Sequence, residues 1–203
     1  NQHYATPSNQ APRMAERGEP GETRQLALEL RLIADVGIVG VPNAGKSTLL
    51  AAVTNAKPKI ANYPFTTLEP NLGVAVLGSD DPSGLRHQTL VLADIPGLIE
   101  GASHGVGLGF AFLRHIQRTR VLIHLLDGAG ADPLADFSQI NAELALFDER
   151  LTGRPTVVAV NKIDLPEAQE RWPALEAELK RRGAEPLAVS AVSGQNVRQL
   201  LFR

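Results

Sequence analysis

Cysteine is missing from all 203 residues, so disulfide bridges and thiolate metal sites are excluded. Long apolar runs are missing as well, because runs such as residues 121–126 are far too short to span a membrane. The first ten residues, NQHYATPSNQ, lack the apolar segment that a signal peptide contains. These absences favour a cytoplasmic protein without a membrane span.

An excess of charge of either sign is also missing. The chain has 20 basic and 22 acidic residues, a net charge of −2, so nucleic-acid binding would need a local basic patch. The short run Lys180, Arg181 and Arg182 is interpreted as a solvated helix end. A content of 43% hydrophobic and 21% charged residues is typical of a globular protein, and the length suits one substantial domain with some extra sequence.

Apolar strands alternate with helical segments along most of the chain. Strands are predicted at residues 34–39, 72–77, 89–93, 121–126, 156–160 and 186–189, after a lead-in strand at 26–32. Helices are predicted at 47–55, 110–118, 132–150, 167–182 and from 195 to the end. This order predicts an α/β fold: a mostly parallel six-stranded sheet with helices on both faces and a site at the carboxyl ends of the strands.

The first strand leads directly into a glycine-rich loop. Residues 40–47, GVPNAGKS, match G-x-x-x-x-G-K-[ST] between a strand and a helix. Gly40 and Gly45 permit the backbone turns that aim consecutive N–H groups at phosphate oxygens. Lys46 is expected to reach the β- and γ-phosphates, and the hydroxyl of Ser47 to bind Mg²⁺. The predicted phosphate-binding residues are Gly40, Val41, Pro42, Asn43, Ala44, Gly45, Lys46, Ser47 and Thr48.

Two further loops are expected to complete the phosphate site. Residues 57–71 hold three prolines and two threonines without an apolar period, and so long a bare connection suggests function. After the strand at 89–93, the sequence reads D-x-x-G. Asp94 would hold Mg²⁺ through a water molecule, and Gly97 would let the backbone approach the γ-phosphate.

A fourth loop is expected to select the base. Residues 161–164 read N-K-x-D after a buried strand. The carboxylate of Asp164 can only accept hydrogen bonds, and guanine offers it two donors, N1–H and the 2-amino group. Adenine has no matching pair, so ATP would leave the acceptor unpaired at a cost of about 1–3 kcal/mol, which makes a P-loop ATPase the weaker reading. Asn161 is expected to approach the O6/N7 edge, and the stem of Lys162 to pack on the ring.

These motifs, in this order, resemble the G domain of the translation-factor-like GTPases. More narrowly, GVPNAGKSTLL, NYPFTTLEPNLG, ADIPGLIEGAS and NKIDL resemble the Obg family, and the resemblance covers nearly the whole chain. The lead-in ATPSNQAPR and GEPGE is similar to the end of that family's glycine-rich N-terminal domain. The resemblance implies that residues 1–33 are the tail of an upstream domain with a linker strand, and that 34–203 form a Ras-like G domain with a truncated last helix.

The resemblance also implies roles for individual residues. Thr67, twenty positions after Ser47, would complete the Mg²⁺ shell when GTP is bound, with Thr66 as the alternative. Lys46, Thr67 and Gly97 are therefore the expected catalytic residues. The last box would contact guanine O6 through a backbone N–H and consists of Ser190, Ala191 and Val192. The other residues expected at the nucleotide are Phe65, Leu68, Glu69, Ile95, Pro96 and Ile163.

Leu98 departs from the Ras-like pattern, which has a water-orienting glutamine at this place. Leucine cannot hydrogen-bond, so we expect slow intrinsic hydrolysis that a partner, a cation or another loop accelerates. Asn43 is a candidate for holding K⁺ near the phosphates, and a simple turn residue is the equal alternative. His104 is interpreted as a solvated histidine, and His124 as a satisfied histidine of the core.

The expected function is that of a GTP-binding protein that slowly hydrolyses GTP·Mg²⁺ to GDP and phosphate. The resemblance implies a switch that binds the large ribosomal subunit during its maturation and senses guanosine tetraphosphate under stress. The alternative is a guanine-nucleotide-sensing binding module whose turnover is incidental. A cytoplasmic monomer is expected.

Overall fold

The computed structural model describes residues 5–11, 13, 18, 21–24, 34–54, 59–60, 71–78, 88–94, 116, 118–148, 151 and 153–203. The chain divides into two units, Asn1–Leu30 and Arg31–Arg203. In the first unit the backbones of Thr6 and Asn9 exchange hydrogen bonds of 3.1 and 3.0 Å, which close a short turn. The predicted strand at 26–32 lies outside the described residues.

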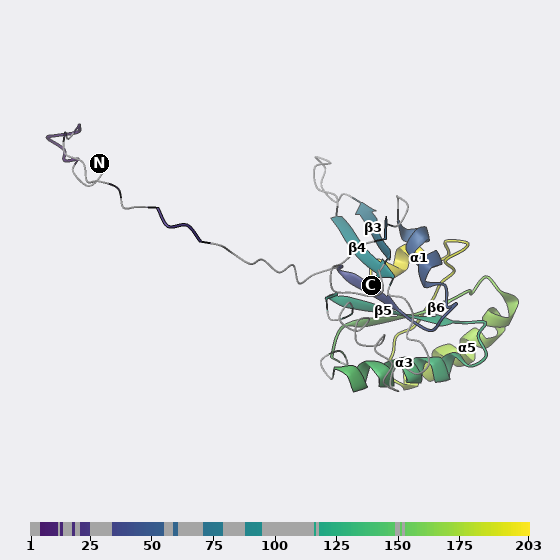
Figure 1. Ribbon diagram of the computed structural model, residues 1–203. Helices are drawn as coiled ribbons and strands as arrows, with labels where there is room; N and C mark the ends of the chain where they lie inside the picture. Colours follow the sequence, from purple (N-terminus) through teal and green to yellow (C-terminus); the bar gives the residue numbers. More distant parts are fainter. Residues whose placement is uncertain are drawn as a thin grey trace. The chain divides into compact units, whose positions relative to one another are not determined.

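The second unit is built on one mixed sheet with the strand order β2-β3-β4-β1-β5-β6-β7 (Figure 1). Its strands are β1 (Val36–Val39), β2 (Lys59–Ile60), β3 (Asn71–Gly78), β4 (Gln88–Asp94), β5 (Val121–Asp127), β6 (Thr156–Asn161) and β7 (Leu187–Ala188). The pairs β4–β1, β1–β5, β5–β6 and β6–β7 are parallel, and β2–β3 and β3–β4 are antiparallel. The predicted fold and its six strands are confirmed. The two-residue β2, too short to leave a pattern in the sequence, adds a seventh strand at the edge.

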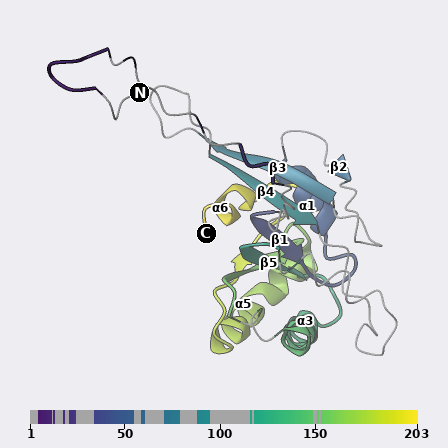
Figure 2. The same cartoon turned by 60° about the vertical axis from the view of Figure 1, so that its left-hand side comes forward.

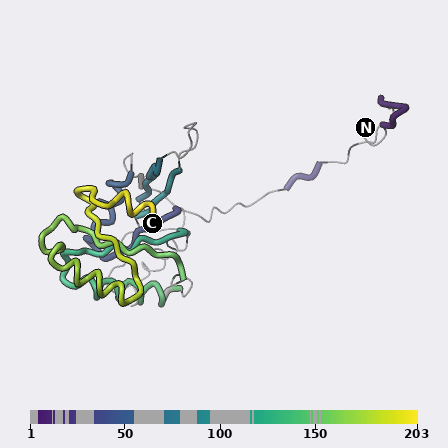
Figure 3. The backbone as a smooth tube through the Cα atoms, turned by 180° about the vertical axis from the view of Figure 1, so that it is seen from behind, coloured from purple at the N-terminus to yellow at the C-terminus, as the bar shows by residue number. Residues whose placement is uncertain are grey.

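Helices cover both faces of this sheet (Figures 1 and 2). They are α1 (Lys46–Val53), α3 (Pro133–Phe147), α5 (Pro166–Arg181) and α6 (Val197–Leu200). Leu49 and Leu50 of α1 share one core cluster with Leu200 of α6. The other face is covered by α3 and α5, which lie side by side in Figure 3. No helix within the described ranges has the length and apolar character that crossing a membrane requires.

Local sequence signals explain the beginning of α3 and both ends of α5. The side chain of Asp132 accepts hydrogen bonds from the N–H groups of Leu134 and Ala135 at 3.1 and 3.0 Å, and so begins α3. Pro166 stands in the first turn of α5, where a missing N–H is harmless, and Gly183, at φ 82°, lies just beyond its end. Both helices match their predictions except at the end of α3, which stops at Phe147 rather than at residue 150.

The prediction and the structure differ most at the last helix. It was expected from residue 195 to the end, but α6 spans four residues. Asn196 precedes it in a left-handed conformation, with φ 56°, and residues 201–202 form a turn. The predicted helix at 110–118 lies mostly outside the described residues.

The core is buried between the sheet and the two helix layers. All four residues of β1 are buried, as expected for a central parallel strand that is covered on both faces. On the face of α1 the cluster includes Ile38, Leu49, Leu50, Leu92 and Leu125. On the opposite face the clusters include Val39, Leu122 and Ile140, and, farther along the sheet, Leu126, Val158 and Leu179.

His124 is a polar residue inside this core. It lies on β5 between Val39 of β1 and Val158 of β6, it is 0% exposed, and its ring stacks on Phe137 of α3 with centroids 5.2 Å apart. Neither ring nitrogen has a hydrogen-bond partner among the described residues. The predicted core histidine is therefore buried, and within the described part of the chain it is not satisfied. Burial lowers its pKa to about 4.

Because the unfolded chain protonates His124 near pH 6.5, this group makes the folded state lose stability as the pH falls from 6.5 toward 4. Between pH 7 and pH 5 the loss should be about 2 kcal/mol. Urea unfolding at both pH values measures it, and His124→Leu serves as the control because it cannot titrate. If His124→Leu lost as much stability between pH 7 and pH 5 as the unaltered chain, the assignment to His124 would be contradicted.

Candidate nucleotide-binding site

The predicted site lies where the direction of the chain through the sheet reverses. β1 has β4 on one side and β5 on the other, so the loops that leave these strands diverge around its carboxyl end. Open α/β sheets bind ligands at such a point. The glycine-rich loop follows β1, and Asp94, Asp127 and Asn161 are the last residues of β4, β5 and β6.

The glycine-rich loop closes around the side chain of Lys46. The ammonium Nζ donates hydrogen bonds to the carbonyl oxygens of Gly40 and Val41 at 2.9 and 3.0 Å. Lys46 is 8% exposed, and burial lowers its pKa while the charge of Asp94 acts in the opposite direction. The predicted phosphate-binding lysine is therefore held at the N-terminus of α1 by carbonyl groups of its own loop.

Ser47 and Asp94 meet beside this lysine. The Ser47 hydroxyl donates to Oδ2 of Asp94 at 2.5 Å, although 47 positions separate the two residues. Asp94 is 3% exposed, and its Oδ1 has no partner among the described residues. A buried, unpaired carboxylate oxygen next to a hydroxyl suits a hard cation such as Mg²⁺. Across the described ranges no three His, Cys, Asp or Glu side chains form a metal site, so phosphates and water would have to supply the other ligands.

Asn161 connects the phosphate loop with the last box. Its Nδ2 donates to the carbonyl oxygen of Ala44 at 2.8 Å, and its Oδ1 accepts from the N–H of Ala191 at 2.9 Å. Asn161 is 3% exposed, so water does not compete for these bonds. The predicted contact with the purine edge is not tested, and one Nδ2 hydrogen remains for it.

The bridge through Asn161 leaves no room for a side chain at Gly45. Its φ of 95° is left-handed, and a Cβ built on it would lie 2.3 Å from Nδ2 of Asn161. At Gly40 an added Cβ would lie 2.3 Å from the carbonyl oxygen of Leu125 in β5. Neither glycine of the motif has room for a side chain, because the loop lies so close to β5 and to the end of β6.

The expected base-binding residues surround the end of β6. Asp164 is exposed, and no hydrogen bond joins its carboxylate to another described residue. Ile163 is buried, and its N–H donates to the carbonyl of Val189 at 3.2 Å. Ser190 is buried and accepts a hydrogen bond from the N–H of Ser193 at 3.0 Å, which shapes the last box, whereas Val192 is exposed.

Several predicted site residues lie outside the described residues, so their roles stay predictions. They are Phe65, Thr66, Thr67, Leu68, Glu69, Ile95, Pro96, Gly97, Leu98 and His104. Of the expected catalytic residues the structure therefore places Lys46, while Thr67 and Gly97 remain untested.

The prediction missed Asp127, which ends β5 opposite Asn161 in the parallel register. Its carboxylate contacts the ammonium of Lys162 at 2.5 Å. An acid at the end of an apolar strand, here in HLLDGAG, is the signal that could have identified it.

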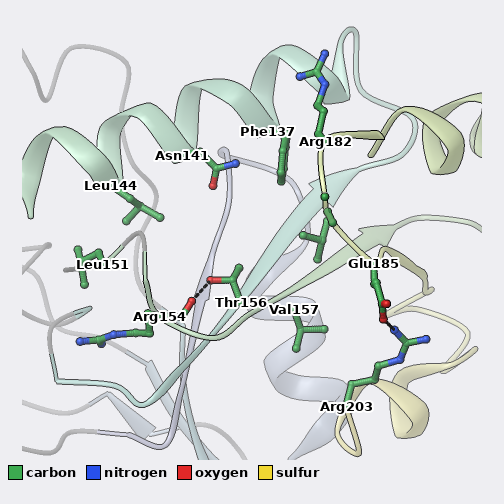
Figure 4. A pocket seen from close by; sticks show the side chains of 13 residues that line it. Phe137, Asn141, Leu144, Leu151, Arg154, Thr156, Val157, Arg182, Glu185 and Arg203 are labelled. Carbon is green, nitrogen blue, oxygen red and sulfur yellow. Dashed lines mark hydrogen bonds and ion pairs between the residues drawn. The ribbon is translucent and has the colours of Figure 1, made fainter. Parts of the chain in front are cut away.

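A cavity of about 600 Å³ opens elsewhere in this unit (Figure 4). Thr156 and Val157, at the beginning of β6, face Asn141 and Leu144 of α3 across it. The glycine-rich loop and Asn161 lie at the carboxyl ends of the strands, whereas this cavity lies near the beginning of β6. It is therefore separate from the candidate site.

A glycine-rich loop after β1, an acid ending β4 and N-K-x-D ending β6 on this sheet define a Ras-like P-loop G domain. Residues 35–162 match the family model described as a 50S ribosome-binding GTPase. The chain therefore belongs to the 50S ribosome-binding GTPase family.

Curated relatives and solved structures agree with this class. The chain is 54% identical over 204 residues to GTPase Obg of Symbiobacterium thermophilum, with 99% of the chain and 46% of that protein covered. The likeness to the Obg family is thus confirmed, and the chain spans about half the length of the curated relatives it matches. An Era variant of Aquifex aeolicus bound to GDP·AlF4⁻ gives a TM-score of 0.61 at 24% identity, covers 83% of this chain and 55% of its own, and supports the fold alone. Era in complex with MgGDPNP and a segment of 16S ribosomal RNA gives 0.59 at 25%, with coverage of 82% and 54%.

Proposed function

We propose that the chain binds GTP·Mg²⁺ and hydrolyses GTP to GDP and phosphate. The observation that carries the proposal is the bridge of Asn161 from Ala44 to Ala191, because it holds a phosphate-binding loop and a base-binding loop against the same strand. The likeness to GTPase Obg supports it. A nucleotide would then lie with its phosphates at the N-terminus of α1 and its base beside Asp164.

At the phosphate end the residues of the chain provide positive charge and oriented donors. Lys46 would exchange its carbonyl partners in the loop for the β- and γ-phosphates, and the first N–H groups of α1 would point at the same oxygens. Ser47 would bind Mg²⁺ directly and Asp94 through water, in agreement with the unpaired Oδ1. Mg²⁺, when bound, neutralises charge between the β- and γ-phosphates.

At the base end the chain selects guanine. Asp164 is exposed beside the loop that Asn161 anchors, so its carboxylate is available to accept from N1–H and the 2-amino group of guanine. An adenine base offers no such pair of donors. We propose that this mismatch, rather than the shape of the phosphate loop, excludes ATP.

The turnover of the isolated chain is slow in this proposal, because Leu98 cannot orient water as glutamine does. Unassisted Ras-type sites turn over at about 10⁻⁴ per second. Asn43 stands exposed in the phosphate loop with φ 64°, and we propose that it helps hold K⁺ near the phosphates. With GTP bound, the γ-phosphate and Mg²⁺ would hold Thr67 and the Gly97 region together, and hydrolysis would release them.

The partner we propose is the large ribosomal subunit during its maturation. The description of the matching family supports this partner, and we propose a cytoplasmic location that is consistent with it. Guanosine tetraphosphate shares its guanine and its 5′-diphosphate with GDP, so the same site would sense it under stress. We further propose that residues 1–33 end an upstream domain, because the relatives are about twice as long as this chain. We also propose a monomer.

Asp164→Asn should exchange guanine for xanthine preference. The amide offers a donor to the carbonyl that xanthine carries in place of the 2-amino group, and we expect GDP affinity to fall about 100-fold. Competition of GDP, XDP and ADP for the chain measures this change. Glu167→Gln, an exposed acid in the first turn of α5, is the matched control and should leave the preference unchanged. ADP binding as tight as GDP binding would refute the base assignment.

GTP hydrolysis should be about tenfold faster in K⁺ than in Na⁺ at equal ionic strength, because a bound K⁺ places charge at the transition state. Phosphate release in the two buffers measures the difference. Asn43→Gly keeps the left-handed backbone and removes the amide, and should abolish the difference. Equal rates in both salts would remove the K⁺ site.

Large ribosomal subunits should raise the multiple-turnover rate of phosphate release, because they would supply what Leu98 lacks. Small subunits at the same concentration are the control. Unchanged turnover, combined with nucleotide-dependent binding to large subunits, would instead favour a guanine-nucleotide-sensing module whose hydrolysis is incidental.

A further inference from the structure

The base-binding loop contains a cation whose partner lies on another strand. Lys162 follows Asn161 and has a left-handed backbone with φ 67°. Its ammonium reaches Oδ2 of Asp127 at 2.5 Å, and the two side chains are 31% and 14% exposed. An ion pair that is partly withdrawn from water fixes both side chains more firmly than a surface pair does.

Asp127 is itself held from three directions. Its backbone ends β5 in register with Asn161, its Oδ1 accepts from the N–H of Ala129 at 3.0 Å, and its carbonyl accepts from the N–H of Gly130 at 3.1 Å. A Cβ on Gly130 would lie 3.1 Å from that carbonyl oxygen, so the turn packs closely against the aspartate. The carboxylate of Asp127 is therefore held in place, and the longer side chain of Lys162 extends to it.

The loop around Asp127 is tied to the base-binding loop through its backbone as well. The N–H of Gly128 donates to the carbonyl of Asn161 at 3.0 Å. Arg171 of α5 donates to the carbonyl of Gly130 at 2.7 Å. The carboxylate and the N-K-x-D loop thus occupy fixed positions relative to each other, and the ion pair spans them.

We propose that Asp127 is a positioning residue for guanine-nucleotide binding, which acts by holding the stem of Lys162 in place beside Asp164. This inference rests on the proposed function. A free lysine side chain loses rotamer freedom when a base packs on its methylenes, and the ion pair removes most of that freedom before the nucleotide arrives. Asp127 therefore strengthens nucleotide binding without touching the nucleotide.

Asp127→Asn tests this role in the 203-residue chain. Asparagine keeps the volume and an acceptor for the N–H of Ala129, but removes the negative charge opposite Lys162. GDP affinity should fall about fivefold, mainly through faster dissociation. The KM for GTP should rise, while kcat at saturating GTP stays within about twofold, since Lys46 and Ser47 are unaffected. The control is Glu176→Gln, which breaks the pair of Glu176 and Lys180 at 2.7 Å on α5 and should change neither value.

A second arm asks whether Asp127 acts through the lysine. Lys162→Met keeps an unbranched stem without the ammonium, and should itself bind GDP about fivefold more weakly. Adding Asp127→Asn to Lys162→Met should then change GDP affinity less than twofold. An equal loss in both backgrounds would mean that the carboxylate acts on the fold or the nucleotide directly, which overturns the proposal.

The two proposals fail in different ways. If the unaltered chain binds guanine nucleotides and Asp127→Asn binds them equally well, this inference is overturned and the proposed function stays intact. Failure of the unaltered chain to bind guanine nucleotides overturns both. Should Asp127→Asn not fold, Lys162→Met decides, because GDP binding as tight as that of the unaltered chain would show that the ion pair orders nothing.

Discussion

The amide of Asn161 is the contact on which the geometry of the candidate site depends. It bonds to Ala44 in the phosphate loop and to Ala191 in the last box, and these partners are 117 and 30 positions away in the chain. Both partners are backbone groups, so the bonds place whole loops rather than single side chains. Because the amide is buried, breaking either bond would leave polar groups unpaired at a cost of about 1–3 kcal/mol.

The sheet gives this amide a rigid base. β6 is paired on both sides, with β5 and β7, and the strand ends at Asn161 itself. β5 in turn pairs with β1, which carries the phosphate loop. Parallel strands that share their hydrogen bonds in this way place their carboxyl ends at fixed offsets, so each loop begins from a defined position. The chemistry of the site is thus distributed over loops, while its geometry is set by the strands.

Much of this arrangement could be predicted from the sequence. β5 and β6 were predicted to within one residue at their ends because buried parallel strands are continuous apolar runs. The phosphate loop and N-K-x-D were recognisable because their spacing is local. The start of the last helix was not predictable, because Asn196, which precedes it, adopts a left-handed backbone that its neighbours do not signal. The bond between Asp127 and Lys162 was also hidden, since it joins residues 35 positions apart whose meeting depends on strand register.

Gly45 shows how closely the two ends of the site are coupled. A side chain at this position would collide with the amide of Asn161 as well as require a left-handed backbone. Any larger residue at this point would therefore displace Asn161, which anchors the loop after β6. The loop after β1 and the loop after β6 therefore cannot vary independently at this point, since one change at Gly45 would disturb both.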